Sequence, residues 1–441
     1  LAVKLELVAN NNLLVFINAA TDPFANSSDD GEINTQVINN IIGNNSYDIG
    51  HVVGTGGGGL AILGAVCDSL YKGDGVTGAG APNNDAFYID YVAHEIGHQF
   101  GASHTFNGSA GACAGNRVEE AAYEVGSGST IMSYAGICGN QNLQSHSDAF
   151  FHSKSIDEMR TFISSGGGSN CGSVTGAINN TAIVDAGADY TIPAHTPFIL
   201  TGSASDVDSA NLTYSWQQFD LGAASASNAE QVDDGFRPLF RVWSPVNNVE
   251  RFLPKLESIL TNSSSIGEVL PSTNRELNFR LLVRDGEGGV SFDANKISVV
   301  NTGEAFAVVS PLLNDIWTSN SHNISWQVAL TNNAPINCTS VDILLSTDGG
   351  NNFTHSLSAN VANNGSSEVS LAAFCGNEIN TSMARVKVAC SDNIFFAINN
   401  GNFAINKTAT AGDIMITSQS PFSINQGVSI TITIDRFTYS F

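Results

Sequence analysis

The chain has 441 residues, which exceeds the size at which one hydrophobic core stops growing, so we expect roughly two to four domains. Its formal net charge of −24, from 41 acidic and 17 basic residues, disfavours nucleic-acid binding, because a phosphate backbone requires a basic patch and no window offers a Lys/Arg cluster. The apolar run at residues 60–67 is far shorter than the roughly 20 residues of a membrane span.

The cysteines are scattered singly and form no CxxC pair of the kind that builds a structural zinc ribbon. This usage predicts disulfides in an oxidising compartment, and the odd count leaves at least one cysteine unpaired or paired outside the chain. The seven positions are 67, 113, 138, 171, 338, 375 and 390.

The first 165 residues mix strand and helix signals. LAVKLELVA (1–9), LLVFINA (13–19) and YDIGHVV (47–53) predict strands, and NTQVINNIIG (34–43) predicts a short amphipathic helix. Because residue 1 falls inside an apolar alternation, we expect preceding sequence to be removed or uncovered. GTGGGGLAILGAVC (54–67) has no GK[ST] ending, so it is interpreted as an exposed loop leading into an edge strand rather than a phosphate loop.

A helix is predicted through YIDYVAHEIGHQF (88–100), capped by Asn84 or Asp85. Val92, Ile96 and Phe100 recur every four residues and define its apolar face. His94 and His98 are also four residues apart, on roughly the opposite side of the helix.

Two imidazoles one helical turn apart can bind a single zinc ion, and Glu95 is then placed to act on a water molecule as a general base. Gly101 can end the helix in a left-handed conformation, which lets His104 approach as the third ligand. The alternative is that these are ordinary polar residues of a helix surface.

HEIGHQFGASH (94–104) resembles the extended zinc motif of the metzincin metallopeptidases. TIMSYAGICG (130–139) supports the resemblance, since it offers Met132 for the methionine turn that metzincins carry beneath the metal. Tyr134 matches the position at which the astacin and serralysin types use a tyrosine as a further ligand or transition-state hydrogen-bond donor.

Within this clan the chain resembles the adamalysin or reprolysin branch. The resemblance implies that the segment with Gly59, Leu60 and Ala61 pairs antiparallel with bound peptide through backbone groups. It also implies that SHSDAFFHSKSIDEMRTFI (145–163) forms the wall of the specificity pocket and then the C-terminal helix. Ser155 and Glu158 would form a capping box for that helix. Single histidines off the motif, at 146 and 152, are interpreted as structural.

The same resemblance implies disulfides between Cys67 and Cys171 and between Cys113 and Cys138. Three features depart from the branch. Thr105 replaces the usual aspartate, and HTF is similar to the pappalysin branch, which is the second candidate. The usual first strand and long first helix are missing, and no calcium-binding nonapeptide repeats appear.

Behind the Gly/Ser-rich linker at residues 164–176, strand patterns alternate with turn signals. Trp216 and Trp326 are placed like core tryptophans of immunoglobulin-like sandwiches. DAGADYTIPAHTPFILTGSASDVDSANLTYSW (185–216) resembles modules appended to bacterial secreted enzymes. Asp206 and Asp208 could bind structural calcium, the alternative being a solvated turn.

The predicted architecture is therefore multidomain, with an α/β metzincin-type peptidase domain followed by all-β immunoglobulin-like sandwiches. The predicted boundaries are 1–170 for the peptidase, 173–302 and 303–408 for two sandwiches, and 409–441 for an incomplete β segment that includes GVSITITID.

The predicted function is that of a secreted zinc endopeptidase that hydrolyses extracellular proteins through a metal-activated water, with Glu95 as general base. Its expected partners are protein or peptide substrates, without nucleic acid or a membrane span, and the expected state is a monomer. The rival hypothesis is an adhesion or carbohydrate- or matrix-binding protein whose metzincin-like domain is catalytically silent.

Overall fold

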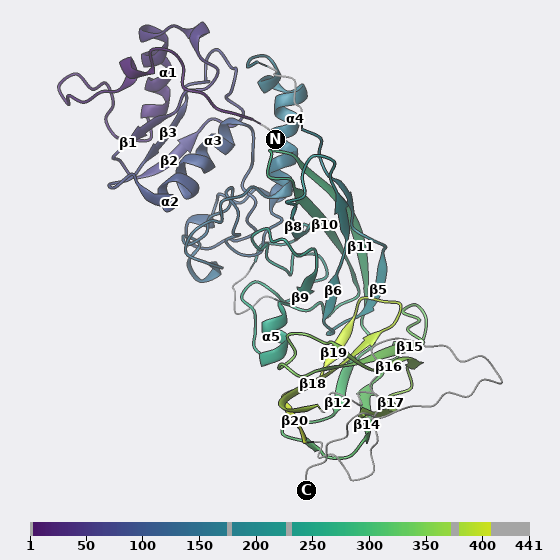
Figure 1. Cartoon of the computed structure of the whole chain (residues 1–441). Helices are drawn as coiled ribbons and strands as arrows, with labels where there is room; N and C mark the ends of the chain where they lie inside the picture. The colour runs from purple at the N-terminus through teal and green to yellow at the C-terminus, as the bar shows by residue number, and fades with distance from the viewer. Residues whose placement is uncertain (1–2, 174–178, 226–231, 372–378, 407–441) are drawn as a thin grey trace, which may run out of the picture.

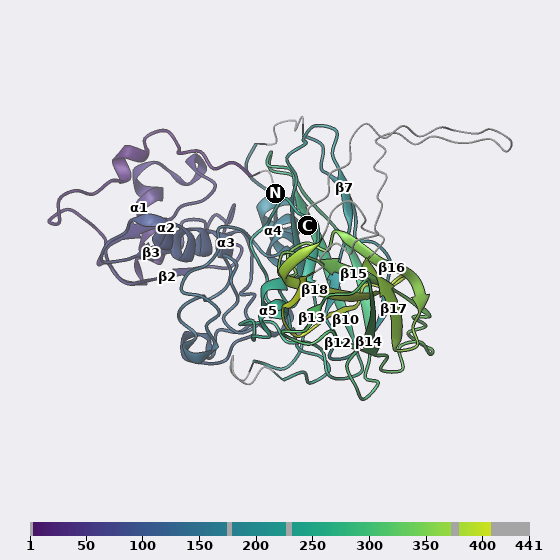
Figure 2. The ribbon, with the colours of Figure 1, turned by 60° about the horizontal axis from the view of Figure 1, so that its bottom comes forward.

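The computed structural model describes residues 3–173, 179–225, 232–371 and 379–406. An N-terminal α/β domain is followed by immunoglobulin-like β-sandwich modules, so the predicted multidomain fold class is confirmed (Figure 1). Helices α1 to α4 belong to the N-terminal part, whereas the long strands, with α5 beside them, form the C-terminal part, as the view turned by 60° also shows (Figure 2). The predicted segment 409–441 lies outside the described residues.

The N-terminal domain contains a three-stranded sheet in the order β1-β3-β2. β1 (Val52–Gly54) runs parallel to β3 (Gly75–Gly78), and β2 (Gly58–Ala61) pairs antiparallel with the other side of β3. Helix α1 (Asp30–Ile41) packs on this sheet. β2 is an edge strand reached from a glycine-rich loop, as predicted.

The central strand β3 was not predicted from the sequence. Its four residues, GVTG, are all buried and show no polar alternation, so the period-two signal of a half-exposed strand is absent. Glycine also has a low strand propensity. The predicted strand at 47–53 is correspondingly shorter, since β1 contains only its last two residues and Gly54.

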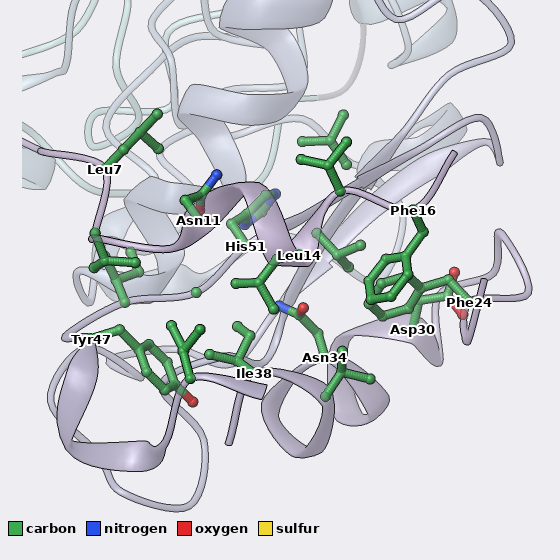
Figure 3. Close-up of a pocket in the computed structure, with 18 of the residues that line it drawn as sticks. Leu7, Asn11, Leu14, Phe16, Phe24, Asp30, Asn34, Ile38, Tyr47 and His51 are labelled. Atoms are coloured by element: carbon green, nitrogen blue, oxygen red, sulfur yellow. The ribbon is translucent and has the colours of Figure 1, made fainter. Parts of the chain in front are cut away.

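The prediction of strands at 1–9 and 13–19 is wrong for the described residues. No strand includes residues 3–19, and a short 3-10 helix, η1 (Asn11–Leu14), interrupts them. The apolar alternation leaves Leu7 86% exposed, because no neighbouring strand supplies hydrogen bonds or a covered face. The segment covers a cavity of about 520 Å³, into which Leu14 and Phe16 point together with Ile38 of α1 (Figure 3).

One continuous helical stretch contains the zinc-type motif. It consists of α2 (Asn84–Phe87), a π-helical turn η3 (Tyr88–Ala93) and α3 (His94–Gln99). The cap residue is Asn83, not Asn84 or Asp85, and its side chain makes no capping hydrogen bond.

The end of α3 is fixed by a left-handed glycine, as predicted. Gly101 has φ +87°, its N–H donates to the His98 carbonyl at 2.8 Å, and the next N–H, of Ala102, donates to Gly97 at 2.9 Å. This pair of bonds is a Schellman motif. It turns the chain back toward the helix within one residue and so brings His104 to the same side as the first two histidines.

Helix α4 (Ser153–Ser165) begins earlier than the sequence indicates. Its N-cap is His152, whose Nδ1 accepts a hydrogen bond from the N–H of Lys154 at 3.1 Å. The predicted capping box of Ser155 and Glu158 is therefore wrong. Ser155 lies inside the first turn, and Glu158 instead accepts from the N–H of Ser103 at 2.9 Å, so it ties α4 to the loop after α3.

The first β-rich module contains a four-stranded sheet in the order β5-β11-β10-β8 and two strand pairs, β4 with β7 and β6 with β9. Its elements are β4 (Ile183–Asp185), β5 (Tyr190–Pro193), β6 (Phe198–Leu200), β7 (Ser203–Ser205), β8 (Thr213–Gln218), β9 (Arg251–Leu253), α5 (Leu256–Thr261), β10 (Arg275–Arg284) and β11 (Val290–Val300).

The second module packs the sheet β12-β14-β17 against the sheet β13-β20-β18-β15-β16, with β19 pairing β18. Its strands are β12 (Ala307–Ser310), β13 (Ile316–Trp317), β14 (Ser321–Gln327), β15 (Ser340–Ser346), β16 (His355–Ala362), β17 (Ser366–Ser370), β18 (Asn380–Cys390), β19 (Phe396–Ile398) and β20 (Phe403–Asn406).

The two modules share one continuous hydrophobic core, which includes both tryptophans predicted as core residues. Trp216 and Trp326 are each 3% exposed. Across the junction, the Ile199 N–H donates to the Ile394 carbonyl at 3.0 Å. The modules are therefore joined by packing as well as by the chain.

Both disulfides implied by the family resemblance are present. Cys67 pairs with Cys171 and Cys113 with Cys138, while Cys338 and Cys390 form a third bridge in the second module. Cys375 lies outside the described residues. Within the described ranges, no helix has both the length and the apolar character to cross a membrane.

The buried His152 makes stability depend on pH. Burial, helped by the charges of Arg280, Arg284 and Lys154, lowers the pKa of His152 to about 3. An unfolded chain, with a histidine pKa of about 6.5, takes up this proton first, so stability falls by at most about 1.4 kcal/mol per pH unit as pH drops below that value.

We expect His152→Asn, which keeps a capping acceptor, to remove this part of the slope in urea unfolding followed between about pH 6.5 and 4. The exposed His195→Asn variant is the control. A slope in His152→Asn equal to that of the unaltered protein would contradict the assignment.

Candidate metal centre

Three histidine side chains converge at the end of α3. The Nε2 atom of His98 lies 3.1 Å from Nε2 of His94 and 3.0 Å from Nε2 of His104. His94 and His98 come from one face of the helix, and His104 comes from the loop that the Schellman turn directs back. These three ligand atoms form a group that could hold a metal ion.

The other ring nitrogen of each histidine is fixed by a backbone carbonyl at 2.7 Å. Nδ1 of His94 donates to Ile131, that of His98 to Ala102, and that of His104 to Asn116. Each Nδ1 therefore carries the proton, and each Nε2 presents a lone pair to the common point. Three lone pairs this close repel one another unless a cation lies between them, so the residues fit a metal ion.

The spacing also suits zinc. Tetrahedral zinc with Zn–N bonds of about 2.0 to 2.1 Å places its nitrogen ligands about 3.3 Å apart, close to the separations found here. Burial lowers the pKa of His98 to about 4, and the charge of His104 adds to this effect. Burial likewise lowers the pKa values of His94 and His104. The three rings are thus neutral and ready to bind near neutral pH.

Glu95 lies between the histidines and the edge strand β2. Glu95 is 7% exposed, and burial raises its pKa to about 8. A Cβ added to Gly59 would lie 2.4 Å from Oε1 of Glu95. The side chain therefore occupies the space that a larger residue would need on β2, and the absence of a Cβ at position 59 sets where the carboxylate lies.

Met132 lies beneath the helix, fully buried. A Cβ on Gly97, between the two helical histidines, would lie 2.4 Å from the Met132 sulfur, so the turn at 130–133 approaches α3 very closely. The carbonyl of Met132 accepts from the N–H of Thr105 at 3.0 Å, and the neighbouring Ile131 carbonyl holds His94. The methionine turn thus positions two of the three histidine segments.

Tyr134 packs against two of the candidate ligands. Its ring centroid lies 4.6 Å from that of His104 and 5.5 Å from that of His94. Burial, together with the charge of Glu95, raises the pKa of Tyr134 to about 12, so its hydroxyl remains protonated. The phenol is a hydrogen-bond donor at the edge of the histidine cluster.

The sequence analysis missed Glu124, a buried carboxylate that joins the two loops around the histidines. It accepts from the Thr105 hydroxyl at 2.6 Å, from the N–H groups of Ser129 and Thr130 at 2.8 and 3.1 Å, and from the Thr130 hydroxyl. Thr105 follows His104 directly, and residues 129–130 begin the methionine turn. Where the adamalysin or reprolysin branch usually has an aspartate, this chain has Thr105, whose hydroxyl binds Glu124.

The remaining predicted site residues have the following places. Leu60 and Ala61 lie on β2, whose outer side pairs with no described strand. His146 is not near the metal group: its Nδ1 lies 2.8 Å from Oδ2 of Asp90, which anchors the loop 139–152 to the π-helical turn. This agrees with the structural role predicted for it.

Nothing in the described residues supports the calcium expectation. Oδ1 of Asp206 accepts the N–H groups of Asp208 and Ser209 at 2.7 and 3.0 Å, as in a turn. Oδ2 of Asp208 accepts two hydrogen bonds from Asn180 at 2.7 Å. These contacts fit the alternative, a surface turn.

Comparison with protein families matched residues 1–162 to Metallo-peptidase family M12B, Reprolysin-like. This match supports a reprolysin-like metallopeptidase, a hydrolase that acts on proteins, as the N-terminal domain. A comparison with curated proteins gave no match.

Solved structures with similar parts include the two that follow. The N-terminal Ig1-2 module of the Drosophila receptor protein tyrosine phosphatase DLAR is 8% identical, with coverage of 52% of this chain and 100% of that one and a TM-score of 0.28. The Bacteroides ovatus protein SGBP-B, solved with a mixed-linkage heptasaccharide, is 11% identical, with coverage of 52% and 48% and a TM-score of 0.15. Such distant matches carry no functional argument.

Glu124→Gln should weaken the metal centre. The amide presents an NH₂ group to backbone donors that need acceptors, so we expect roughly 2–4 kcal/mol of lost stability and a roughly 10- to 100-fold loss of zinc affinity. Urea unfolding and competition with a chelator measure the two effects. The exposed Glu119→Gln is the matched control, and equal zinc affinity in the two variants would refute the role.

Gly59→Ala should displace Glu95 without removing the metal. The new methyl group overlaps the Glu95 carboxylate, so we expect zinc content to persist and peptide hydrolysis to fall roughly a hundredfold. Gly57→Ala, where an added Cβ meets nothing within 4 Å, is the control. Full activity in Gly59→Ala would show that the position of Glu95 does not depend on this glycine.

Proposed function

We propose that the chain is a secreted zinc endopeptidase of the reprolysin-like type that hydrolyses extracellular proteins. The observation that carries the proposal is the convergence of three lone-pair nitrogens, of His94, His98 and His104, with the Glu95 carboxylate beside a free strand edge. The match of residues 1–162 to reprolysin-like peptidases supports it independently. The pappalysin branch is the second candidate, because Thr105 stands where the adamalysin or reprolysin branch usually has an aspartate.

Zinc, when bound by the three Nε2 atoms, would supply a Lewis acid that polarises the scissile carbonyl and an attacking water. Glu95 takes a proton from that water on its carboxylate and passes it to the leaving amine. Its burial favours the proton-bearing form of the carboxyl group, which suits a residue that must hold the proton until the amine leaves. Gly59 keeps it in this position.

Tyr134 contributes a second proton-bearing group. Its protonated hydroxyl, next to His94 and His104, can donate a hydrogen bond to the carbonyl oxygen as negative charge develops there. Such a donor helps only as the charge grows, which is how a residue lowers a barrier rather than merely binding substrate.

The substrate would bind in an extended conformation along β2. Residues 58–61 form an edge strand, and Leu60 is 56% exposed. Backbone groups of Gly59, Leu60 and Ala61 then pair antiparallel with the peptide, which leaves recognition of side chains to neighbouring pockets. The glycines of the preceding loop let the peptide backbone approach closely.

Three disulfides suit an extracellular setting, where such bonds persist. We further propose that the protein is a monomer of the bacterial secreted type. Its peptidase unit would span residues 1–170, and its sandwich modules residues 173–302 and 303–408. The strongly acidic chain leaves nucleic acid out of the proposed partners.

The decisive test is Glu95→Gln. We expect the variant to retain one equivalent of zinc by elemental analysis and to lose roughly a thousandfold or more of its casein hydrolysis, since the amide cannot accept the proton. Glu120→Gln, an exposed glutamate, is the control. Undiminished hydrolysis in Glu95→Gln would refute the mechanism. Zinc binding without any hydrolysis in the unaltered chain would favour the adhesion or matrix-binding alternative.

A further inference from the structure

The loops that surround the histidine cluster are held from the outside by the first β-rich module. Residues 222–225, which follow β8, form hydrogen bonds with loops of the peptidase domain. Nη2 of Arg117 donates to the Gly222 carbonyl at 2.8 Å, and the Asn107 amide donates to the Ala223 carbonyl at 2.8 Å. The module is therefore in direct contact with the segment that follows the third histidine.

Ser225 uses its N–H, carbonyl and hydroxyl groups at this boundary. Its N–H donates to the Asn107 carbonyl at 2.8 Å, and its hydroxyl accepts from the Gly126 N–H at 3.1 Å. Its carbonyl accepts from the Ser109 hydroxyl at 3.1 Å and from Nε2 of Gln141 at 2.5 Å. One residue of the module thus binds three separate peptidase segments.

Arg241 carries the contact to the loop 139–152. Its side chain is buried, stacks on Trp243 at 4.1 Å, and donates from Nη1 to the Leu143 carbonyl at 3.4 Å and from Nη2 to the Gln144 side chain. Burial lowers the pKa of this guanidinium, and the charges of Asp148, Glu268 and Glu124 oppose the lowering.

Val242, the residue after Arg241, contacts the start of the methionine turn. The hydroxyl of Ser129 donates to the Val242 carbonyl at 3.0 Å, and the Asp148 N–H donates to the Ser129 carbonyl at 2.7 Å. The Ile131 N–H donates to the Phe150 carbonyl at 3.1 Å, and the Ile131 carbonyl holds His94. A short chain of hydrogen bonds therefore connects the module to the candidate ligand.

The loop 139–152 contains only one short 3-10 helix, η6 (Gly139–Gln141), so its own backbone fixes its shape weakly. The shape of the loop must therefore be fixed by contacts with residues outside it. From within the peptidase domain, Asp90 holds residues 146 and 147, and Ser127 holds residues 141 and 143. The module adds three contacts. Ser225 binds residue 141, Arg241 binds residues 143 and 144, and Arg284 binds the carbonyl of residue 151.

We propose that the first immunoglobulin-like module is a working part of the peptidase site. Arg241 is a positioning residue that fixes the loop 139–152 against the Met132 turn and so determines which substrate side chain fits beside the histidines. This inference rests on the proposed function, and it adds that substrate selection depends on a residue outside the peptidase domain.

The test uses the full chain and two arginine variants. Arg241→Met removes the contacts to the loop. Arg160→Met is the matched control, because Arg160 also donates across the same boundary, to the Val290 carbonyl at 2.8 Å, but from α4 and away from the loop. If Arg241→Met does not fold, Arg241→Lys takes its place, because lysine keeps the positive charge but lacks the two separate Nη donors of the guanidinium.

Two measurements are made on each variant. Hydrogen exchange of peptides from residues 139–150 should become roughly tenfold faster in Arg241→Met and stay unchanged in Arg160→Met. The ratio of kcat/KM for two fluorogenic peptides that differ only in the residue after the cleaved bond, leucine or alanine, should shift roughly fivefold in Arg241→Met alone, with zinc content unchanged.

Unchanged exchange in Arg241→Met, equal acceleration in both variants, or an unchanged peptide ratio would overturn the proposal. An unaltered chain that binds zinc and cleaves neither peptide would instead refute the proposed function and, with it, the claim on substrate selection. The exchange measurement then still decides whether Arg241 holds the loop.

Discussion

Three imidazole lone pairs directed at one point impose the constraint on which the rest of the N-terminal domain depends. Neutral nitrogens 3.0 to 3.1 Å apart repel, so each ring must be held from behind, and each is held by a carbonyl from a different segment. The carbonyl of Ala102 follows the Schellman turn, that of Ile131 belongs to the methionine turn, and that of Asn116 follows Cys113. Much of the local architecture places these three carbonyls.

The part of the domain between α3 and α4 achieves this with apolar packing and buried polar groups together. Its apolar side chains divide between the cluster beneath α3, which includes Ile131 and Met132, and the cluster of Phe106 and the Cys113–Cys138 bridge. Buried polar groups supply the rest, above all the Glu124 carboxylate and the Arg241 guanidinium. A buried charge is costly unless it is fully hydrogen-bonded, and each of these two groups is bonded to backbone atoms of irregular loops. Directional bonds can fix a loop that has no regular structure of its own.

Locally encoded features could be predicted from the sequence. The histidine spacing, the C-cap glycine, the edge strand and the alternating strands of the rear modules each follow from a few neighbouring residues. The disulfide pairing followed only from the family resemblance. The strands expected at 1–9 and 13–19 failed because alternation indicates a strand only where a partner strand exists. β3 was missed because a fully buried, glycine-rich strand has no alternation. Glu124 and Arg241 act on residues distant in sequence, and no local pattern marks them.

The bridge between Cys67 and Cys171 has a consequence for the resistance of the protein to proteolysis. It closes a ring of chain with a sequence separation of 104 residues, and all three histidines and both anchoring turns lie inside it. Cleavage of one peptide bond within the ring leaves the two fragments covalently joined, whereas a cut in the loop 55–57, between β1 and β2, falls outside. Autolysis at a single position in the half of the domain that carries the histidines would therefore not separate its parts, and a nicked molecule keeps its fragments together.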